Sequence, residues 1–314
     1  MQKSTKIKLI LKKLLPSFLF TFIKNIWSGV VVPMQNHIFK YKIKSFKNPE
    51  FITLNFKNIN FDLLIDPSNG LVDTSIYTKR KYEHHILEEM HSHIKAGDRV
   101  LDIGANIGHH TIFMAKLVGG AGEVYAFEPI PKIYNQLEKS VAKNNLNNII
   151  INKYALGEAE KEVEININTS NVGGSSIIEK ELIQNNISYT NNKETHSEYN
   201  NSKIKIQVKT LDSLNLQMVD FIKLDVEGYE WNVLAGGVNT ISKYRPTIIF
   251  EYSPDYFRKA GNSDGNKILN FMQSNSYIMY DLENKRKIIS NIESFEKEFS
   301  PGLRSQTNIL CVQK

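Results

Sequence analysis

The feature that most constrains the fold is a regular alternation of short apolar strands and amphipathic helices from about residue 100 onward. The apolar runs are continuous, as in "VLDIG" at residues 100–104 and "IIFEY" at residues 248–252. Continuous apolar strands are typical of a sheet buried on both faces, and helices between them are typical of parallel crossovers. The pattern therefore predicts an α/β fold, a parallel sheet covered by helices on both sides.

The order of the elements predicts seven strands in the main domain. They lie in "VLDIG", "EVYAFEP", "IIINKYA", "VDFIKLDVEG", "PTIIFEYSP", "YIMYDL" and "QTNILCVQ". Helices are expected over residues 79–95, 108–117, 131–144 and 264–274, with another behind the fourth strand. Upstream, "FITLNFKNINFDLLID" predicts one or two strands before a turn at residues 66–70. Ligands of such a sheet bind beyond the carboxyl ends of its strands.

Composition divides the chain into three predicted segments. Residues 1–47 form a basic extension, residues 48–97 supply strands and a helix that pack on the core, and residues 98–314 form the main domain. Within the main domain, residues 168–203 are polar and rich in asparagine, so a mobile loop is expected there. That loop is either a lid over the substrate, which we favour slightly, or a tolerated insertion. The single cysteine, Cys311, is expected to be a buried thiol in a strand.

The positive charge of the chain is concentrated at its N-terminus. Residues 1–47 contain ten lysines and no acid, while the whole chain has a net charge of +6, so the remainder is acidic. An acidic main domain argues against a nucleic-acid partner. The apolar stretch at residues 14–23 is too short to span a bilayer and contains Pro16. Residues 1–30 therefore either lie on an anionic membrane surface or pack on the domain. The protein is expected to be cytoplasmic.

A glycine-spaced loop follows the first strand of the main domain and indicates a bound adenosine-type cofactor. Gly104 allows a sharp turn, and Gly108 lets the next helix start close to the ligand and the sheet. Asp102 can fix the loop amides or reach the ligand. The next strand ends in Glu128, twenty residues beyond Gly108, where an acid accepts hydrogen bonds from ribose hydroxyls.

Two details favour S-adenosylmethionine over NAD as the cofactor. Asn106 stands where the dinucleotide fingerprint has a glycine, and its amide suits an amino acid moiety better than a pyrophosphate. In addition, Asp102, Glu128, Asp225 and Glu227 are all expected at one sheet edge. Such an acidic edge suits a sulfonium and repels a pyrophosphate.

The chain resembles a known family in five motifs that occur in order. These are "VLDIGANIGHHTIFMA", "VYAFEPIP", "NKYALG", "VDFIKLDVEGYEWNVLAGG" and "RPTIIFEYSP". Together they resemble the FkbM-type class I S-adenosylmethionine-dependent methyltransferases over roughly residues 80–313. The resemblance implies a Rossmann-like three-layer sandwich with a seven-stranded sheet, the last strand antiparallel. It also implies O-methyl transfer to a sugar of a surface glycan (capsule, O-antigen or glycolipid precursor) or to a related secondary metabolite.

Residue roles follow from the resemblance together with the strand geometry. The methionine end of the cofactor is assigned to Gly104, Asn106 and Gly108, and the ribose to Glu128. Ala155 and Leu156 are expected to flank the adenine. Asp225, at the end of its strand, is expected to touch the cofactor or the acceptor. These assignments predict a small-molecule or glycan acceptor and leave the oligomeric state open.

The proton of an acceptor hydroxyl requires a base, and several side chains are candidates. In an extended strand Lys223, Asp225 and Glu227 point the same way, so Lys223 is expected to pair with Asp225. Asp225 or Glu227 is the favoured base, and Glu251 is the third choice. His109 and His110 are expected to be neutral; one of them serves as the base, or both line the pocket or face the sheet. Three carboxylates at one sheet edge also suit a divalent cation that would lower the pKa of the acceptor, but their spacing matches no dedicated site. No metal site is therefore predicted, and His84, His85, His91 and His93 scatter around a helix.

Three alternatives remain beside O-methyl transfer. N-methylation of another acceptor is disfavoured because the chain has no Pro-Pro pair of the kind that base-amino methyltransferases use to hold a planar amine. An NAD-dependent oxidoreductase is disfavoured by the loop sequence. A non-catalytic membrane-surface adaptor with the same fold is disfavoured because loop glycines, ribose acid and strand-end carboxylates occur together.

Overall fold

The computed structural model describes residues 46–167, 202–259, 265–299 and 303–314. The chain divides into two compact units, Met1–Asn48 and Pro49–Lys314, and the account below concerns the second. The membrane-surface segment at residues 1–30 and most of the insertion at residues 168–203 lie outside the described residues, so both interpretations stay predictions. None of the described helices has the length and apolar content that a membrane span requires.

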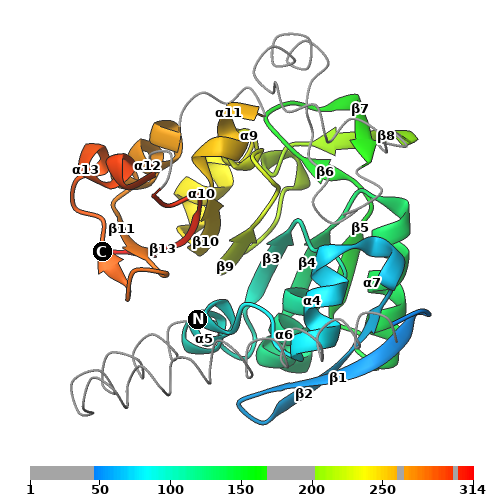
Figure 1. The fold of residues 1–314 in the computed structure, drawn as a ribbon. Helices are drawn as coiled ribbons and strands as arrows, with labels where there is room; N and C mark the ends of the chain where they lie inside the picture. The colour runs from blue at the N-terminus through cyan, green and yellow to red at the C-terminus, as the bar shows by residue number, and fades with distance from the viewer. Residues whose placement is uncertain (1–45, 168–201, 260–264, 300–302) are drawn as a thin grey trace, which may run out of the picture. The chain divides into compact units, whose positions relative to one another are not determined.

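A central sheet of eight strands forms the middle layer of the fold (Figure 1). The predicted α/β fold with a mostly parallel sheet is confirmed, and all seven predicted strands are present. The last strand is antiparallel to its neighbours, as expected. The eighth strand is a two-residue addition at one edge, too short to leave a sequence signal. In spatial order the strands are β12 (Lys287–Ile288), β11 (Tyr277–Asp281), β13 (Thr307–Gln313), β10 (Thr247–Tyr252), β9 (Phe221–Leu224), β3 (Arg99–Ile103), β4 (Glu123–Phe127) and β5 (Ile149–Asn152).

Helices connect the parallel strands and cover the sheet. From β3 the chain steps outward to β4 and β5, whereas from β9 it steps in the opposite direction to β10. The strand order therefore reverses direction between β3 and β9, and this boundary is the topological switch point. Because crossovers are right-handed, those on opposite sides of the boundary place their helices on opposite faces of the sheet. On one face lie α6 (His109–Val118) and α7 (Pro131–Lys143). The helices that follow β9 in the chain are α9 (Glu230–Ala235), α10 (Val238–Tyr244), α11 (Pro254–Lys259), α12 (Gly265–Ser274) and α13 (Ile292–Glu296).

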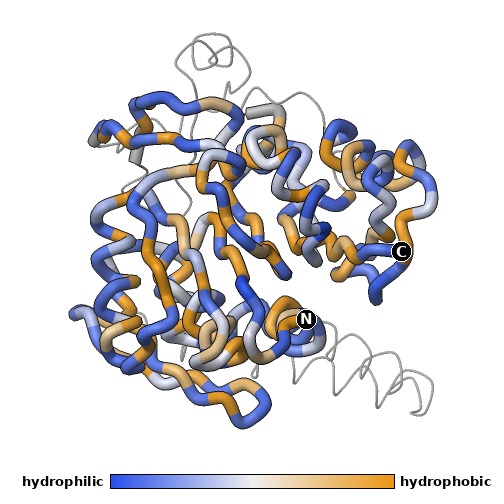
Figure 2. The backbone as a smooth tube through the Cα atoms, turned by 180° about the vertical axis from the view of Figure 1, so that it is seen from behind, coloured by the Kyte–Doolittle hydropathy of each residue, from blue (hydrophilic) through white to orange (hydrophobic). Residues whose placement is uncertain are grey.

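The core lies between the sheet and these helices. Every residue of β9 is buried, and the strands of the sheet appear as mostly hydrophobic segments in Figure 2. Ile222 and Phe250 pack in one cluster with Leu269 of α12. Cys311 is buried within β13, as expected. The continuous apolar pattern of these strands therefore reflects burial on both faces.

An N-terminal hairpin covers the α6 and α7 side of the domain. It consists of β1 (Glu50–Phe56) and β2 (Ile59–Ile65), joined through Lys57 and Asn58, which both have positive φ. Side chains of α7 bond the free edge of β2: Ser140 Oγ accepts from Leu64 N at 3.0 Å, and Asn144 Oδ1 accepts from Asp62 N at 3.0 Å. Side chains at the end of a helix thereby satisfy backbone N–H groups on the free edge of β2 that another strand would otherwise bond.

Two regions differ from the sequence-based prediction. The helix expected at 79–95 is present only as α5 (His84–His93), because a break in which Arg80 and Glu83 have φ of 50° and 41° separates it from α4 (Leu71–Lys79). The apolar pattern does not show such a left-handed break. A separate small sheet of β6 (Ala155–Leu156), β7 (Lys161–Ile167) and β8 (Ser202–Lys209) was also not predicted, apart from Ala155, where the strand expected in "IIINKYA" ends. Ser202 and Lys203, at the end of the predicted insertion, begin β8.

We predict that the hairpin contributes to the stability of the whole unit. Leu63 of β2 is fully buried, so Leu63→Ala should lower the free energy of unfolding by about 3 kcal/mol. Phe51 on the outer face is 43% exposed, and Phe51→Ala should cost about 1 kcal/mol or less. Urea unfolding measures both. Equal effects of the two substitutions would show that the hairpin does not belong to the core.

Candidate active site

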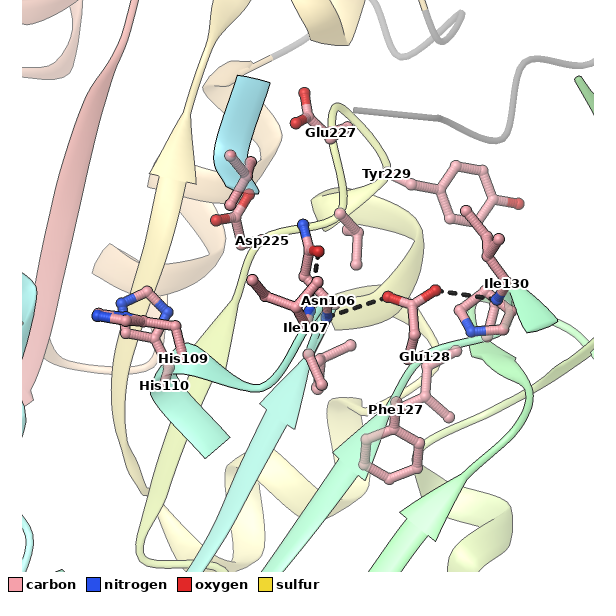
Figure 3. Close-up of a pocket in the computed structure, with 18 of the residues that line it drawn as sticks. Asn106, Ile107, His109, His110, Phe127, Glu128, Ile130, Asp225, Glu227 and Tyr229 are labelled. Atoms are coloured by element: carbon pink, nitrogen blue, oxygen red, sulfur yellow. Dashed lines mark hydrogen bonds between the residues drawn. The ribbon is translucent and has the colours of Figure 1, made fainter. Parts of the chain in front are cut away.

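A pocket opens at the carboxyl ends of β3, β4 and β9, next to the switch point (Figure 3). This is the sheet edge at which the strand order predicts a ligand. Five stretches of chain supply its main walls: the loop at residues 103–107 with the start of α6, the segment at residues 127–130, β6, the segment at residues 225–229, and Tyr82 with Glu83 before α5.

Glycine is required where the β3–α6 loop meets the end of β9. Gly104 has φ of 86°, and a Cβ atom there would lie 1.9 Å from the carbonyl oxygen of Asp225. Gly108 caps α6 with φ of 92°, and a Cβ there would lie 2.4 Å from a methyl of Leu137. Both positions combine a left-handed backbone with no room for a side chain. Gly104 therefore sets how closely the loop approaches the strand that carries Asp225.

Glu128 is held in the middle of the pocket by backbone donors. Its Oε2 accepts from Asn106 N at 3.1 Å and its Oε1 accepts from Ile130 N at 2.9 Å (Figure 3). The side chain is buried, and burial raises its pKa to about 7. Each carboxylate oxygen keeps one acceptor site for a further donor. The geometry therefore fits the hydroxyl pair of a ribose, as expected for Glu128.

Asn106 shapes the loop between the two glycines. Its φ of 49° is left-handed, a conformation that asparagine tolerates better than most residues, and its side-chain Oδ1 accepts from Ile107 N at 2.8 Å. The amide group lines the pocket. Its contact with the methionine end of the cofactor stays a prediction.

The wall on the other side of Glu128 is apolar. Ala155 and Leu156 line it, as predicted, together with Phe127 and Ile130. Tyr229, which the sequence analysis did not single out, lines the same wall (Figure 3). Flat apolar walls suit a purine base, so this part of the pocket fits the adenine end of the cofactor.

Asp102 lies behind the pocket and is not one of its lining residues. It is 1% exposed and accepts a hydrogen bond from Thr111 Oγ1 of α6 at 2.5 Å. The structure thus shows Asp102 linking β3 to α6, which differs from both roles expected for it, fixing the loop amides or reaching the ligand. Its assignment as a cofactor-binding residue stays a prediction.

The predicted ion pair between Lys223 and Asp225 is present at the acidic end of the pocket. Lys223 Nζ lies 2.9 Å from Asp225 Oδ2, and the lysine is 1% exposed. Burial alone would lower the pKa of Lys223, but the charges of Asp225 and Glu83 outweigh burial and raise it. The lysine therefore stays charged and holds Asp225 at the pocket wall, where a further face of the carboxylate remains partly exposed.

Glu227 lies at the pocket wall because of a turn in the backbone, and not because of the strand alternation that was predicted. The strand β9 ends at Leu224 and Glu227 has φ of 53°, so the strand alternation does not extend to it. It still lines the pocket. Burial and the neighbouring charge of Asp225 raise the pKa of Glu227 to about 8. Glu227 is thus a carboxylate of unusually high basicity facing the ligand space.

Glu251, the third candidate base, lies beside Asp225 but is not a pocket-lining residue. It belongs to β10, and burial together with the charges of Asp225 and Glu227 raises its pKa to about 10. Glu251 therefore does not face the ligand space that Asp225 and Glu227 line. The geometry therefore favours Asp225 and Glu227 over Glu251 for contact with a substrate.

Four side chains from Tyr82 to His110 form the remaining wall at the acidic end. His109 and His110 line the pocket, and burial lowers the pKa of His109 to about 3 and that of His110 well below its usual value, so both are neutral, as predicted. Sequence analysis missed Tyr82 and Glu83, because it placed them inside a continuous helix. Glu83 Oε2 lies 3.4 Å from His110 Nε2.

Of the four histidines in α5, three make contacts typical of packing or surface roles. The His84 ring packs edge-on against Phe56, His85 Nε2 lies 3.0 Å from Glu283 Oε1, and His93 Nδ1 lies 2.9 Å from the carbonyl oxygen of Glu89. These contacts agree with the packing and surface roles predicted for the group.

We predict that Lys223 is needed for stability because it is the counter-charge of a buried carboxylate. Lys223→Met should lower the free energy of unfolding by about 3–5 kcal/mol, the cost of leaving a buried charge unpaired. The exposed pair Lys57 and Glu88 offers a control, and Lys57→Met should cost about 1 kcal/mol or less. Thermal or urea unfolding checks both, and a Lys223→Met protein as stable as the wild type would contradict this reading.

Comparisons with known proteins agree with this geometry. A family model described as the methyltransferase FkbM domain matches residues 102–279, and a model of protein-L-isoaspartate O-methyltransferases matches residues 41–159. The chain is 25% identical over 149 residues to "Methyltransferase 1" of Beauveria bassiana, covering 44% of this chain and 57% of that protein. It is 40% identical over 58 residues to a protein-L-isoaspartate O-methyltransferase of Fervidobacterium nodosum, covering 18% and 29%.

The chain also aligns with a solved structure. The FkbM methyltransferase of Methylobacillus flagellatus aligns with a TM-score of 0.42 and 15% identity, covering 91% of this chain and 60% of that one. The chain spans less than two thirds of the length of both curated relatives named above. The match of the FkbM model nevertheless extends over more than half of the chain and includes β3, β4, β9 and β10. The chain therefore belongs to the methyltransferase FkbM domain family, whose cofactor is S-adenosylmethionine.

Proposed function

We propose that this protein transfers a methyl group from S-adenosylmethionine to a hydroxyl oxygen of a sugar, in a surface glycan or a related secondary metabolite. The observation that carries the proposal is the pairing of an apolar, Glu128-centred pocket with a carboxylate, Glu227, at its acidic end. The first part suits an adenosine and the second suits the proton of an alcohol. The names of the relatives support methyl transfer, and one of them is an O-methyltransferase by name.

The described residues fit the cofactor in three places. Glu128 would hold the ribose, Ala155 and Leu156 with Tyr229 would enclose the adenine, and the loop around Asn106 would hold the amino acid end. S-adenosylmethionine, when bound, supplies a methyl group attached to a positively charged sulfur. The carboxylates of Asp225 and Glu227 provide a negative environment at the same end of the pocket, which favours a cation there.

Glu227 is the residue that we propose as the general base. A base must lie within reach of the acceptor proton and have a pKa near the working pH. Glu227 lines the pocket, has no hydrogen-bond partner among the described residues, and has a raised pKa. Asp225 is already bonded to Lys223, so its remaining role is to position the acceptor. The neutral imidazole of His110 beside Glu83 is a second polar contact for the acceptor.

Two alternatives retain the fold but change the function. An N-methyltransferase would use the same cofactor pocket with an amine acceptor, and a non-catalytic adaptor would bind no cofactor. Gly104, Glu128 and Glu227 all line one pocket, which argues for catalysis. Contact of residues 1–30 with an anionic membrane is part of the proposal and rests on their lysines alone. It would place the enzyme beside lipid-linked glycan precursors.

We predict that affinity for S-adenosylhomocysteine rises with pH between pH 6 and 8. Burial raises the pKa of Glu128 to about 7, and ribose hydroxyls donate to the ionised form, so protonation below that pKa weakens binding. Below the pKa the affinity should fall by up to about tenfold per pH unit. Titration calorimetry at pH 6, 7 and 8 measures this slope.

The matched variants are Glu128→Gln and Asp73→Asn. Glu128→Gln should bind more weakly at pH 8 and lose the slope. Asp73 is also buried, has a pKa raised by burial to about 6, and does not line the pocket, so Asp73→Asn should keep the wild-type slope. Wild-type affinity and slope in Glu128→Gln would remove the ribose assignment.

We predict that Glu227→Gln lowers methyl transfer by about 10²–10⁴-fold while leaving affinity for S-adenosylhomocysteine unchanged, because only proton acceptance is lost. The acceptor is identified by mass spectrometry of surface glycans from cells with and without the gene. Complementation with the wild type should restore one O-methyl group, and complementation with Glu227→Gln should not. Identical glycans in all strains, or methyl groups found only on nitrogen, would contradict the proposal.

A further inference from the structure

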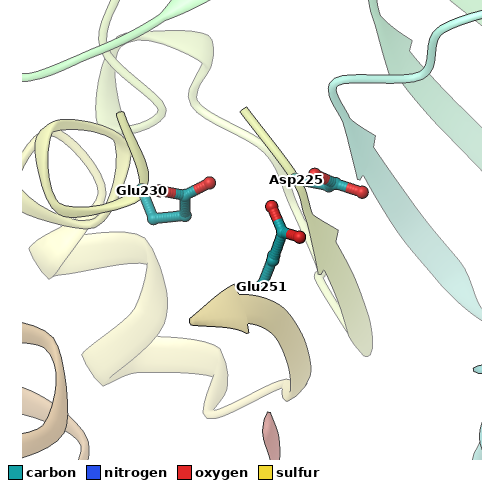
Figure 4. A group of neighbouring side chains, drawn as sticks. All are labelled: Asp225, Glu230 and Glu251. Carbon is teal, nitrogen blue, oxygen red and sulfur yellow. The ribbon is translucent and has the colours of Figure 1, made fainter. Parts of the chain in front are cut away.

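Three carboxylates that are separated in the sequence converge beside the pocket (Figure 4). Asp225 follows β9, Glu230 is the first residue of α9, and Glu251 lies in β10. One carboxylate oxygen of each lies within 4.8 Å of those of the other two. The sequence analysis did not find this group, because Glu230 was not among its candidates.

Glu230 carries the evidence that something is bound between these groups. The residue is fully buried, and its Oε1 accepts from the backbone N–H groups of Val226 at 3.0 Å and Gly228 at 3.3 Å. These two bonds fix the carboxylate in a direction toward Asp225 and Glu251 (Figure 4). Its other oxygen, Oε2, is buried and has no hydrogen-bond partner among the residues that the structure describes. Buried carboxylate oxygens are normally paired, so an unpaired one indicates an absent partner.

The charges around this group point to a cation as that partner. Within the described residues, one ion pair reaches the group, from Lys223 to Asp225. The same lysine also compensates Glu83 and Asp102. Glu230 and Glu251 form no ion pair of their own in the described part of the chain. Because a carboxylate has two oxygens, Asp225 can bond Lys223 with one and a cation with the other.

The ligand set indicates which cation would bind. Oxygens that surround a hard divalent ion at about 2.0–2.6 Å lie up to about twice that distance apart, and the spacing of at most 4.8 Å is within this limit. Three carboxylates without histidine or thiolate favour magnesium, manganese or calcium over zinc or copper. We propose that Asp225, Glu230 and Glu251 bind one divalent cation, Mg²⁺ or Mn²⁺, at the edge of the pocket.

The position of this site suggests its use. Asp225 lines the pocket while Glu230 and Glu251 do not, so the cation would lie just behind the acidic wall and reach the ligand space on the Asp225 side. Three carboxylates leave coordination positions free for water or an acceptor oxygen. A cation there would hold an acceptor hydroxyl and make its proton easier to remove. The metal site stands on the geometry alone, whereas this use of it rests on the proposed function.

Direct Mn²⁺ binding to the full-length protein tests the site. Mn²⁺ alone is titrated into chelator-treated protein without cofactor, and the electron paramagnetic resonance signal of free Mn²⁺ reports the bound fraction. We expect one saturable site that Mg²⁺ competes for. Glu230→Gln and Glu251→Gln should each weaken binding at least tenfold, and Mn²⁺ should raise the melting temperature of the wild type more than that of Glu251→Gln.

The variants separate failure of this inference from failure of the proposed function. Glu230→Gln keeps the oxygen that accepts from Val226 and Gly228, so it should fold and bind S-adenosylhomocysteine like the wild type. Glu128→Gln should show the reverse, with normal Mn²⁺ binding and weak S-adenosylhomocysteine binding. The inference is overturned by the lack of a saturable Mn²⁺ site in the wild type, or by wild-type Mn²⁺ affinity in both Glu230→Gln and Glu251→Gln. Normal S-adenosylhomocysteine binding in the same samples would leave the proposed function standing.

Discussion

The contact between the backbone of Gly104 and the carbonyl of Asp225 is the constraint on which the site depends. It joins the loop after β3 to the end of β9 across the switch point of the sheet. Any side chain at Gly104 would push these two segments apart. The loop contains Asn106, whose backbone N–H bonds Glu128, and β9 leads to Asp225 and Glu227. This one contact therefore aligns the cofactor half of the pocket with the acidic half.

Burial of acids gives the pocket its chemical character. Lys223 neutralises Asp225, but the buried Glu128 and the partly buried Glu227 and Glu251 have no ion-pair partner of their own in the described chain, and their pKa values are raised. A raised pKa makes the binding of a ribose by Glu128 depend on pH near neutrality, and it makes Glu227 a stronger base. The cost of burying these charges falls when a cation arrives, whether as a sulfonium or as a divalent metal. In the proposed function, the same acids serve both cofactor selectivity and catalysis.

The sequence was sufficient for the parts that depend on continuous burial or on glycine. The apolar runs of β3, β9 and β10 predicted the sheet, and the loop from Gly104 to Gly108 with Glu128 predicted the pocket. It was insufficient where side-chain direction depends on single left-handed residues. The breaks at Arg80 and Glu83 and the turn at Glu227 have no periodic signal, so Tyr82 and Glu83 were missed and Glu227 was reached by the wrong argument. Glu230 enters the site only because the fold brings its carboxylate close to Asp225 and to Glu251 of β10, a tertiary relation that spacing does not show.

The measurement that tests the account most directly is a crystal structure of the protein with S-adenosylhomocysteine. The account predicts the adenosine in the pocket beyond β3 and β4, with both ribose hydroxyls bonded to Glu128 and the sulfur on the side of Asp225 and Glu227. A ligand bound elsewhere, or a Glu128 carboxylate directed away from the ribose, would contradict it.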